Sequence, residues 1–579
     1  MTPVAAKGEG KPRRLAVFLV VAGVVATGIA IGTLRGDDRA PQEGALQRAD
    51  GNRAAGLPKQ PYLRKACGIP LRWIRAIDRG WVPGPARAAD IIIVPRPPNY
   101  MGTFVNTSHS GPYDFLQEVP LVFYGPGFIK NLGRWRPARE VTVADIAPTQ
   151  AAIMGFEWPR REGQPITEIL EQGGGSPALV VTVSIDGGGW NVLRRWPEAW
   201  PNLAELMRSG TSIEPAIVGS SPSITPATHT NMSTSTFPRR HGVSAIAIRG
   251  RKGEIQGAFT RSPDRIRPPV DPDLNLRVTT LAEDWDRATG NRAEIGMLAS
   301  GNYPLGLIGS GAGLPGGDKD IAAFLAAEGR WETDGRFYTL PAYVNLPSGT
   351  LRGEIDAVDH ADGKADGRWL GHDLDDTSVN TTPAIAAYEG KVAQRVIARE
   401  GFGEDDVADL LYLHYKSPDH AGHKWNMISP EMGDVLGSVD AAVGSLVTWL
   451  DANVGADRYV MVVTADHGQT PLEAGGWPMS RDELLRDIND RFDTVRNGEG
   501  ILERTSATSL FSNLEEMKAN GVTPADVSSF LSGYTIGDNV SDGSAVPEGF
   551  EERTEEPILA AAFPGRRLDE VESCVRTSS

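Results

Sequence analysis

Several short stretches of this 579-residue chain place acidic, imidazole or hydroxyl side chains directly after apolar runs. They are Asp186 in VVTVSIDGGGWN, Asp419 and His423 in YKSPDHAGHKWN, Asp466 and His467 in MVVTADHGQT, and Thr225 in PSITPATHTN. Carboxylates mixed with imidazoles are typical ligands of zinc and similar transition ions, whereas calcium and magnesium sites are nearly all oxygen. Together the stretches predict a transition-metal site, although any one of them alone could equally be a helix cap or a surface pair.

The elements that would position these side chains are short, β-branched apolar runs, which predict buried strands. They are DIIIVP from Asp90, VPLVFY from Val119, ALVVTVSI from Ala178, EIGMLA from Glu294, DLLYLHY from Asp409 and RYVMVVTA from Arg458. Helical patterns lie between them, as in residues 429–453, where apolar side chains recur on one face. The alternation predicts an α/β fold, a mostly parallel sheet sandwiched by helices, whose ligands bind beyond the carboxyl ends of the strands.

Length and composition agree with a large folded unit. With 40% hydrophobic residues and 66 glycines, the chain can bury one large α/β core or two linked ones. Residues from about 250 to 400 are rich in turn formers, and we interpret them as an inserted cap. The folded domain is therefore predicted over residues 61–575.

A run of twenty residues without a charge, residues 15–34, is long enough to cross a ~30 Å hydrocarbon layer. Basic residues precede it, which predicts a cytoplasmic tail over residues 1–14 and an extracytoplasmic location for the rest. We favour an uncleaved anchor, because the apolar region of a signal peptide is shorter, ~7–15 residues; cleavage and a buried core helix are the alternatives. Residues 35–60 are polar and predict a linker. The predicted location is the plasma membrane, with a single pass.

The net charge and the cysteine content narrow the possible functions and the cellular compartment further. The net charge is −16, and the residues before the linker are basic, so the exported part is more acidic still. Such a surface argues against nucleic-acid binding. The two cysteines, Cys67 and Cys574, lie near the ends of the exported part, in an oxidising compartment where a disulfide could persist.

The segments SIDGGGWN, SPSITPATHTNMSTSTFPRRHGV, SPDHAGHKW and VTADHG resemble, in this order, the motifs of the alkaline phosphatase superfamily. The resemblance is greatest to its type I phosphodiesterase and nucleotide pyrophosphatase branch, and it covers about residues 70–480. It implies two Zn²⁺ ions, or similar divalent transition metal ions. One would be held by Asp186, Thr225, Asp466 and His467, and the other by Asp419, His423 and one further histidine.

In the family, that last histidine lies near the C-terminus, but none of the nine histidines of this chain lies beyond His467. The family's closing segment resembles instead residues 106–127, NTSHSGPYDFLQEVPLVFYGPG, followed by REVTVADIAPTQAAIMG from Arg139. We therefore interpret the chain as a circular permutant in which His109 is the missing ligand. Permutation is tolerated where the termini lie close together, and Cys67 and Cys574 would then flank the seam and pair.

The resemblance also implies a reaction. Thr225 would be the catalytic nucleophile, attacking phosphorus and forming a phosphothreonine that is hydrolysed in a second step. We expect Thr225 at the N-cap of a helix and Pro226 at its first position, so that the free amides of Ala227 and Thr228 point at the phosphoryl group.

The sequence departs from the family at two places. Phosphodiesterase relatives have an asparagine where this chain has Ile246, and monoesterase relatives have a Lys and Arg pair where this chain reads SGNYPLG. Arg249 is a candidate substitute donor, with an exposed strand position as its alternative. Asn302 and Tyr303 are candidates to line the substrate pocket, or else ordinary turn residues.

We therefore predict a membrane-anchored hydrolase of phosphodiester or pyrophosphate bonds. Its substrate would be a small phosphodiester, a nucleotide or a lipid-linked phosphate; the sequence leaves its oligomeric state open. A phosphate monoesterase and a catalytically reduced, metal-stabilised binding module are the alternatives. A sulfatase is disfavoured because TPATH lacks the pattern that such enzymes need, and a phosphoglycerate mutase is disfavoured by the anchor and the threonine.

Overall fold

The computed structural model describes residues 60–578, except 85–88, 104–106, 251, 327–328, 473–474 and 542. The predicted tail, the membrane anchor and all but the last residue of the predicted linker lie outside the described residues. Within the described residues, one helix, Pro430–Gly455, is long and apolar enough to span a membrane. Its apolar side chains belong to the core cluster on one face of the central sheet, which accounts for its composition.

A nine-stranded sheet forms the centre of the fold, in the order β13-β12-β11-β16-β6-β17-β4-β7-β5. Its parallel part is β12 (Ile321–Leu325), β11 (Ile295–Ala299), β16 (Asp409–Tyr415), β6 (Leu179–Ile185) and β17 (Tyr459–Thr464). The outer strands are β13 (Trp331–Glu332), β4 (Leu121–Tyr124), β7 (Thr211–Ile213) and β5 (Gly133–Trp135). β13 and β4 pair antiparallel with their inner neighbours, as β7 does with β4. The prediction of a mostly parallel α/β sheet is confirmed.

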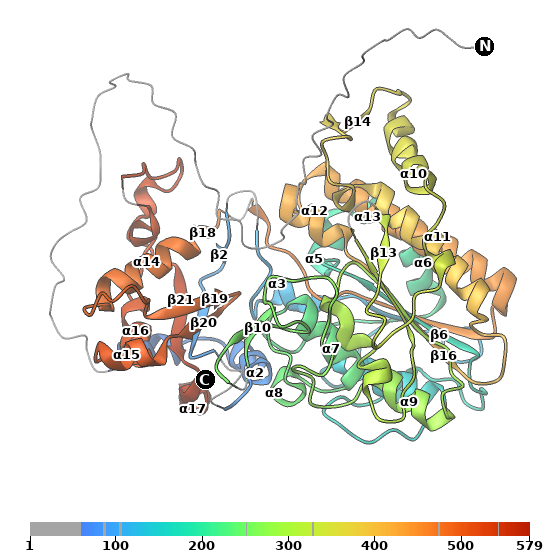
Figure 1. The fold of residues 1–579 in the computed structure, drawn as a ribbon, viewed down its shortest axis with the longest axis horizontal. Helices are drawn as coiled ribbons and strands as arrows, with labels where there is room; N and C mark the ends of the chain where they lie inside the picture. The colour runs from blue at the N-terminus through green and yellow to red at the C-terminus, as the bar shows by residue number, and fades with distance from the viewer. Residues whose placement is uncertain are drawn as a thin grey trace, which may run out of the picture. The chain divides into compact units, whose positions relative to one another are not determined.

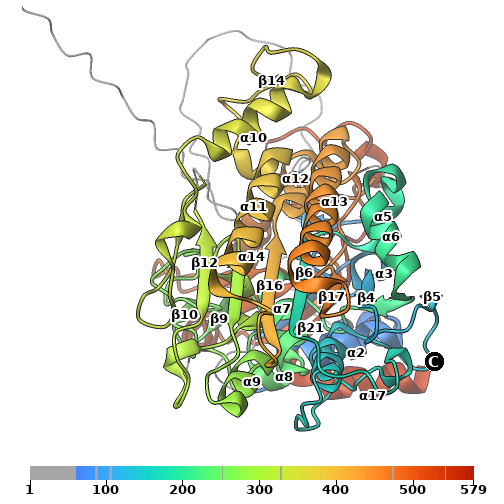
Figure 2. The ribbon, with the colours of Figure 1, turned by 90° about the vertical axis from the view of Figure 1, so that its right-hand side faces the viewer.

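Helices cover both faces of this sheet (Figures 1 and 2). One layer contains α5 (Trp190–Arg195), α6 (Pro201–Ser209), α11 (Pro383–Glu400) and α13 (Pro430–Leu450). The other contains α4 (Ile146–Ile153), α7 (Thr225–Thr234) and α9 (Leu281–Thr289). Successive strand residues alternate between the two layers: Val460 and Val462 pack in one core cluster, and Met461 and Val463 in the other. Both faces are buried, which explains why the strands read as continuous apolar runs.

A second, four-stranded sheet has the order β19-β20-β1-β21. Its strands are β19 (Leu502–Ser506), β20 (Ser509–Ser512), β1 (Ile91–Pro95) and β21 (Leu559–Pro564). The run DIIIVP is therefore a strand, as predicted, but it is not part of the mostly parallel sheet: β1 pairs antiparallel with both neighbours. Both of its faces are buried, so composition alone could not distinguish it from a central parallel strand. The helices around this sheet are α1 (Pro61–Ala66), α2 (Leu71–Gly80), α14 (Arg481–Phe492), α15 (Leu514–Ala519), α16 (Pro524–Leu531) and α17 (Leu568–Ser578).

The predicted cap region combines sheet and surface elements. It contributes β11, β12 and β13 to the central sheet, and it also contains α10 (Thr350–Asp359) and the β14 (Arg368–Trp369) to β15 (His372–Asp373) hairpin. A Cys67–Cys574 disulfide joins the residue after α1 to α17, with Cα atoms 5.4 Å apart. The predicted pairing is confirmed.

Candidate metal centre and nucleophile

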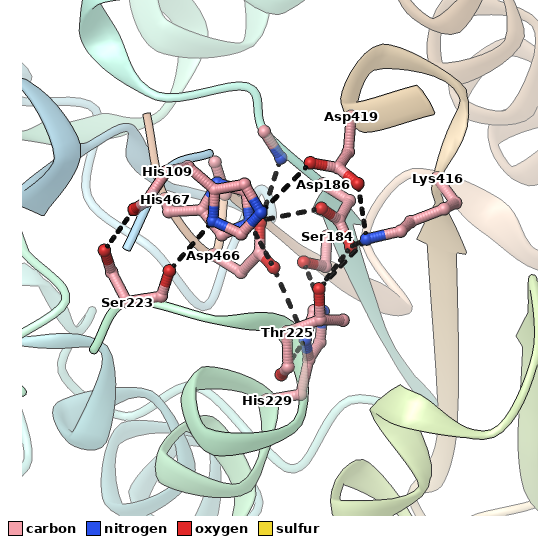
Figure 3. Close-up of polar contacts among 12 residues, drawn as sticks. His109, Ser184, Asp186, Ser223, Thr225, His229, Lys416, Asp419, Asp466 and His467 are labelled. Carbon is pink, nitrogen blue, oxygen red and sulfur yellow. Dashed lines mark hydrogen bonds and ion pairs between the residues drawn. The ribbon is translucent and has the colours of Figure 1, made fainter. Parts of the chain in front are cut away.

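The predicted ligands meet at one edge of the central sheet because parallel strands end there together. Asp186 follows β6, Asp466 follows β17, and Asp419 lies in α12 (Ser417–Trp425), which follows β16. Thr225 begins α7 beneath them (Figure 3). This is the edge at which ligands bind in open α/β sheets.

The first cluster consists of Asp186, Asp466 and His467, each completely buried. His467 Nε2 lies 3.4 Å from Asp186 Oδ1 and 3.3 Å from Asp466 Oδ2. None of these three atoms has a hydrogen-bond partner within the described residues. Buried polar atoms are rarely left unpaired, so three that face one point indicate the place of a ligand.

The second cluster consists of His109, Asp419 and His423. Asp419 Oδ1 lies 3.4 Å from His109 Nε2 and 3.3 Å from His423 Nε2. His109 comes from the loop before α3 (Asp114–Gln117), so the residue inferred from the displaced motif does reach Asp419 and His423.

All three imidazoles are oriented in the same way, through Nδ1. This atom lies 3.0 Å from the Ser223 carbonyl in His109, 2.7 Å from the Thr107 carbonyl in His423, and 3.0 Å from the Gly468 carbonyl in His467. A carbonyl can only accept, so Nδ1 carries the proton and the lone pair of a neutral ring is on Nε2. Metal-binding histidines are typically held by such contacts.

The electrostatics of the clusters favour a cation. Burial and the Asp186 carboxylate raise the pKa of Asp466 to about 7. Burial opposes protonation of His467, but Asp466 and Asp186 raise its pKa to about 9. Burial and the neighbouring His467 lower the pKa of His109 well below its usual range, which keeps that ring a neutral donor. The unpartnered atoms and the surrounding carboxylates fit one divalent ion in each cluster, and in the first cluster the ion would replace the second proton of His467.

The predicted nucleophile lies against the first cluster. Thr225 is 3% exposed, and its Oγ1 donates to Asp186 Oδ2 at 3.2 Å. The helix begins one residue earlier than expected, with Ile224 as N-cap and Thr225 as its first residue. The predicted free amide of Thr228 is therefore wrong, because that N–H donates to the Ile224 carbonyl at 3.0 Å. The amide of Ala227 precedes the first bond of the helix.

Of the two residues predicted to line the pocket, Tyr303 has an observed interaction with a residue of this site. Tyr303 begins the turn Tyr303–Leu307, which packs on α7. Burial raises the pKa of Tyr303 to about 12, although the nearby positive charge of Lys416 lowers it in part. Asn302 is buried and donates to the Arg265 carbonyl.

Arg249, the candidate substitute donor, is neither an exposed strand residue nor a neighbour of the two clusters. Its side chain is buried in β9 (Ala247–Arg249). The guanidinium lies 2.8 Å from Asp90 and 3.3 Å from Glu503, and donates to the Ser512 carbonyl. These three contacts hold the Arg249 guanidinium at the four-stranded sheet.

Sequence reasoning missed three buried residues at the site. Lys416 contacts both clusters and Thr225. His414 Nε2 lies 2.7 Å from Asp186 Oδ2, and His229 lies between the Thr225 carbonyl and the Ser184 hydroxyl, 2.8 Å from each. For His414 and Lys416 the available signal was a basic residue inside or just after a buried strand, because an apolar environment tolerates a charge only with a partner. His229 lies in α7 and had no such signal.

The chain has recognisable relatives. The family model of the type I phosphodiesterase / nucleotide pyrophosphatase matches residues 180–530. A calcium-transporting ATPase of Myroides odoratus is 22% identical over 61% of this chain and 72% of its own length. The alkaline phosphatase PhoV of Synechococcus elongatus is 22% identical over 51% of this chain and 59% of its own length. The crystal structure of wild-type alkaline phosphatase PafA superposes with a TM-score of 0.48 and 16% identity, covering 67% of this chain and 84% of the other.

Proposed function

The chain belongs to the type I phosphodiesterase / nucleotide pyrophosphatase family, and on that premise we propose that it hydrolyses phosphodiester or pyrophosphate bonds with Thr225 as nucleophile. The observation that carries the proposal is the position of Thr225 Oγ1, 3.2 Å from a carboxylate of a buried cluster with three unpartnered ligand atoms. A hydroxyl at that point is next to a cation site, and such a site favours its ionised form.

Each cluster would hold one divalent ion, and we propose zinc for both because each combines imidazole with carboxylate. Asp186, Asp466, His467 and Thr225 would hold the first, and His109, Asp419 and His423 the second. When bound, such a pair supplies Lewis acidity to the attacking and leaving oxygens of an in-line displacement at phosphorus.

The residues of the chain carry the remaining steps. Thr225 loses its proton to solvent, and Oγ1 forms the bond to phosphorus while the leaving oxygen departs with the electron pair of its own bond. Water then attacks phosphorus and releases a proton to solvent, the Oγ1–P bond breaks with its electrons returning to Oγ1, and Oγ1 takes up a proton from solvent to regenerate the threonine. The amide of Ala227, at the start of α7, is available to donate to a phosphoryl oxygen. Before Thr225 ionises, its hydroxyl is oriented by the hydrogen bond to Asp186 Oδ2, an atom that His414 Nε2 also contacts.

We further propose that the order of segments is permuted relative to the family. The family match begins at residue 180, whereas His109 and β4 come earlier in the chain. β4 nevertheless pairs with β17, the strand that ends at the first cluster, and His109 joins the second cluster. The Cys67–Cys574 bond links segments from the two ends of the described chain, where the seam would lie.

A phosphate monoesterase is the second candidate, and one observation favours it. A monoester dianion brings one more negative charge than a diester, and Lys416 supplies a buried positive charge beside Thr225 that could not be predicted from the sequence.

We propose the membrane anchor at residues 15–34 as the tether of the domain to the plasma membrane. A nucleotide or lipid-linked phosphate on the extracytoplasmic side remains the proposed substrate class.

The test compares Thr225→Ala and Thr225→Ser with the natural chain in aryl phosphodiester and aryl phosphate assays. Thr225→Ala should abolish turnover of both while most of the metal stays bound, because three ligands of the first cluster remain. Thr225→Ser, which keeps a hydroxyl, should retain measurable turnover. Acid quenching during turnover should trap phosphate on the peptide containing Thr225. Turnover by Thr225→Ala at the natural rate would refute the proposed nucleophile.

A further inference from the structure

The ammonium group of Lys416 has no role in the mechanism above, yet it lies at the centre of the site. Lys416 directly follows β16 and is 7% exposed. Its Nζ lies 2.7 Å from Asp419 Oδ2, 2.8 Å from Asp186 Oδ2 and 3.0 Å from Thr225 Oγ1 (Figure 3). These three acceptors match the three N–H bonds of an ammonium, so all its donors are directed at the site.

Lys416 does not compete with the proposed ions for carboxylate oxygens, and ionised Thr225 Oγ1 has lone pairs enough for both the ammonium and an ion. It contacts the Oδ2 atom of each carboxylate, whereas the Oδ1 atoms face the histidines: Asp186 Oδ1 faces His467, and Asp419 Oδ1 faces His109 and His423. The two oxygens of each carboxylate are thus divided between the lysine and a cluster. The lysine and the proposed ions can be present at the same time.

We propose that Lys416 is a catalytic residue whose ammonium binds ionised Thr225 Oγ1 and the phosphoryl oxygens of the substrate. The proposal rests on the proposed function, in that it takes Thr225 as the nucleophile. Lys416 would also take the place of two donors that this chain lacks. These are the family's asparagine, where this chain has Ile246, and the Lys and Arg pair, where this chain reads SGNYPLG.

The charge on Oγ1 explains why one ammonium would assist both halves of the reaction. In the first half, Oγ1 gains a bond to phosphorus as the leaving oxygen takes its electron pair. In the second half, water forms a bond to phosphorus, and the Oγ1–P bond breaks with its electrons returning to Oγ1. Oγ1 is therefore anionic before the first step and after the second, and an ammonium hydrogen-bonded to it stabilises both. Lys416 keeps its protons throughout and is not the general base.

A purely structural role is the alternative. A buried Lys between two carboxylates could simply hold them in place, and such ion pairs contribute little net stability because desolvation is costly. The two roles differ in what they predict for an anion. A structural lysine acts through the carboxylates and the metal content, whereas a catalytic lysine also contributes directly to the binding of phosphate.

The experiment uses the zinc-loaded chain with Lys416→Met and Lys416→Arg, and Lys424→Met as the matched control. Lys424 is in the same helix as Asp419, but its Nζ lies over the Trp425 ring, 4.2 Å from the centroid. Three quantities are measured: metal content, affinity for inorganic phosphate by calorimetry, and kcat/KM for aryl phosphate esters. Thermal unfolding reports whether each variant is folded, and Lys416→Gln is a second neutral variant if the methionine is not tolerated.

We expect Lys416→Met to keep both ions, to bind inorganic phosphate at least about tenfold more weakly, and to lose about 100-fold or more in kcat/KM. Lys416→Arg should restore part of both, and Lys424→Met should match the natural chain. Phosphate affinity that is unchanged in Lys416→Met, or a loss of metal that accounts for the whole effect, would overturn the proposal. If the natural chain hydrolyses no ester, the proposed function fails, but the phosphate titration still decides the role of Lys416.

Discussion

The rings of His109 and His467 stack with centroids 3.5 Å apart and planes within 7°. His109 belongs to the second cluster and His467 to the first, so the two proposed ion sites are adjacent and in contact through these rings. The contact joins the segment before the first strand of the family match to the segment after β17. The early part of the chain thus completes a site whose other residues lie within residues 180–530.

The first prediction concerns His109. His109→Ala should lower the metal content from two ions per chain toward one, because the second cluster keeps only Asp419 and His423 as described donors. We expect kcat/KM for aryl esters to fall about 100-fold or more, since one of the two oxygens of the displacement loses its Lewis acid. Plasma emission spectrometry of the dialysed protein measures the metal.

His360→Ala is the control for this variant, because the His360 side chain is 60% exposed and takes no part in either cluster. It should keep both ions and the natural activity. If His109→Ala also retained two tightly bound ions, the role of His109 as a ligand would have to be abandoned, together with the main support for a permuted chain.

The positions of the three carboxylates were predictable from sequence, because a polar side chain that follows a buried strand has to lie at the end of the sheet. Asp186, Asp419 and Asp466 each follow such a strand, and parallel strands end at a common edge. The contact between Lys416 and Thr225 was not predictable in this way. A lysine has a long, flexible side chain, and only the folded site determines whether it points to solvent or to the carboxylates.

Two other features depended on tertiary context. The strand β1 has the apolar composition of a central strand but pairs antiparallel in the four-stranded sheet, since both faces of that sheet are also buried. Arg249 is tied to Asp90 and Glu503, which come from distant parts of the chain, so its sequence neighbours could not reveal its partners.

The second prediction concerns the disulfide. Cys67→Ser with Cys574→Ser removes a bond between residues 507 positions apart, and it should lower the free energy of unfolding by about 2–5 kcal/mol. The cause is the greater conformational entropy of the unfolded chain without the link. Urea unfolding followed by circular dichroism measures the change, and kcat/KM should stay near its natural value because neither cysteine belongs to the two clusters. An unchanged unfolding midpoint would rule out a stabilising role for this bond.

The third prediction concerns pH. Burial and Asp318 raise the pKa of Asp286 to about 7, while burial and Asp286 raise that of Asp320 to about 9. Both values lie above the ordinary 3.8, so the folded state binds protons that the unfolded state has released. Stability is therefore lost as the pH rises from about 4 toward 9. The unfolding temperature, measured by calorimetry, should fall between pH 6 and pH 9, and Asp320→Asn should flatten that fall.

Asp457→Asn is the matched control, because Asp457 is exposed. Its unfolding temperature should follow the natural pH dependence. An equally steep fall in Asp320→Asn would show that other groups determine the pH dependence in this range.

The last prediction concerns the choice between diesters and monoesters. The natural chain lacks the family's Lys and Arg pair, so the two proposed ions, the Ala227 amide and Lys416 are the positive groups that face the phosphoryl group. A diester replaces one charged oxygen by an ester group, which the half-buried Tyr303, near Lys416 and on the turn that packs against α7, can accept. We therefore expect kcat/KM to be higher for an aryl diester than for the matching aryl monoester, and a ratio of about ten or more in favour of the monoester would refute the preference.

Lys416→Met should widen the preference for the diester, because the dianionic monoester loses more from the removal of one positive charge than the monoanionic diester does. Equal losses for the two esters would mean that Lys416 acts on Thr225 Oγ1 alone.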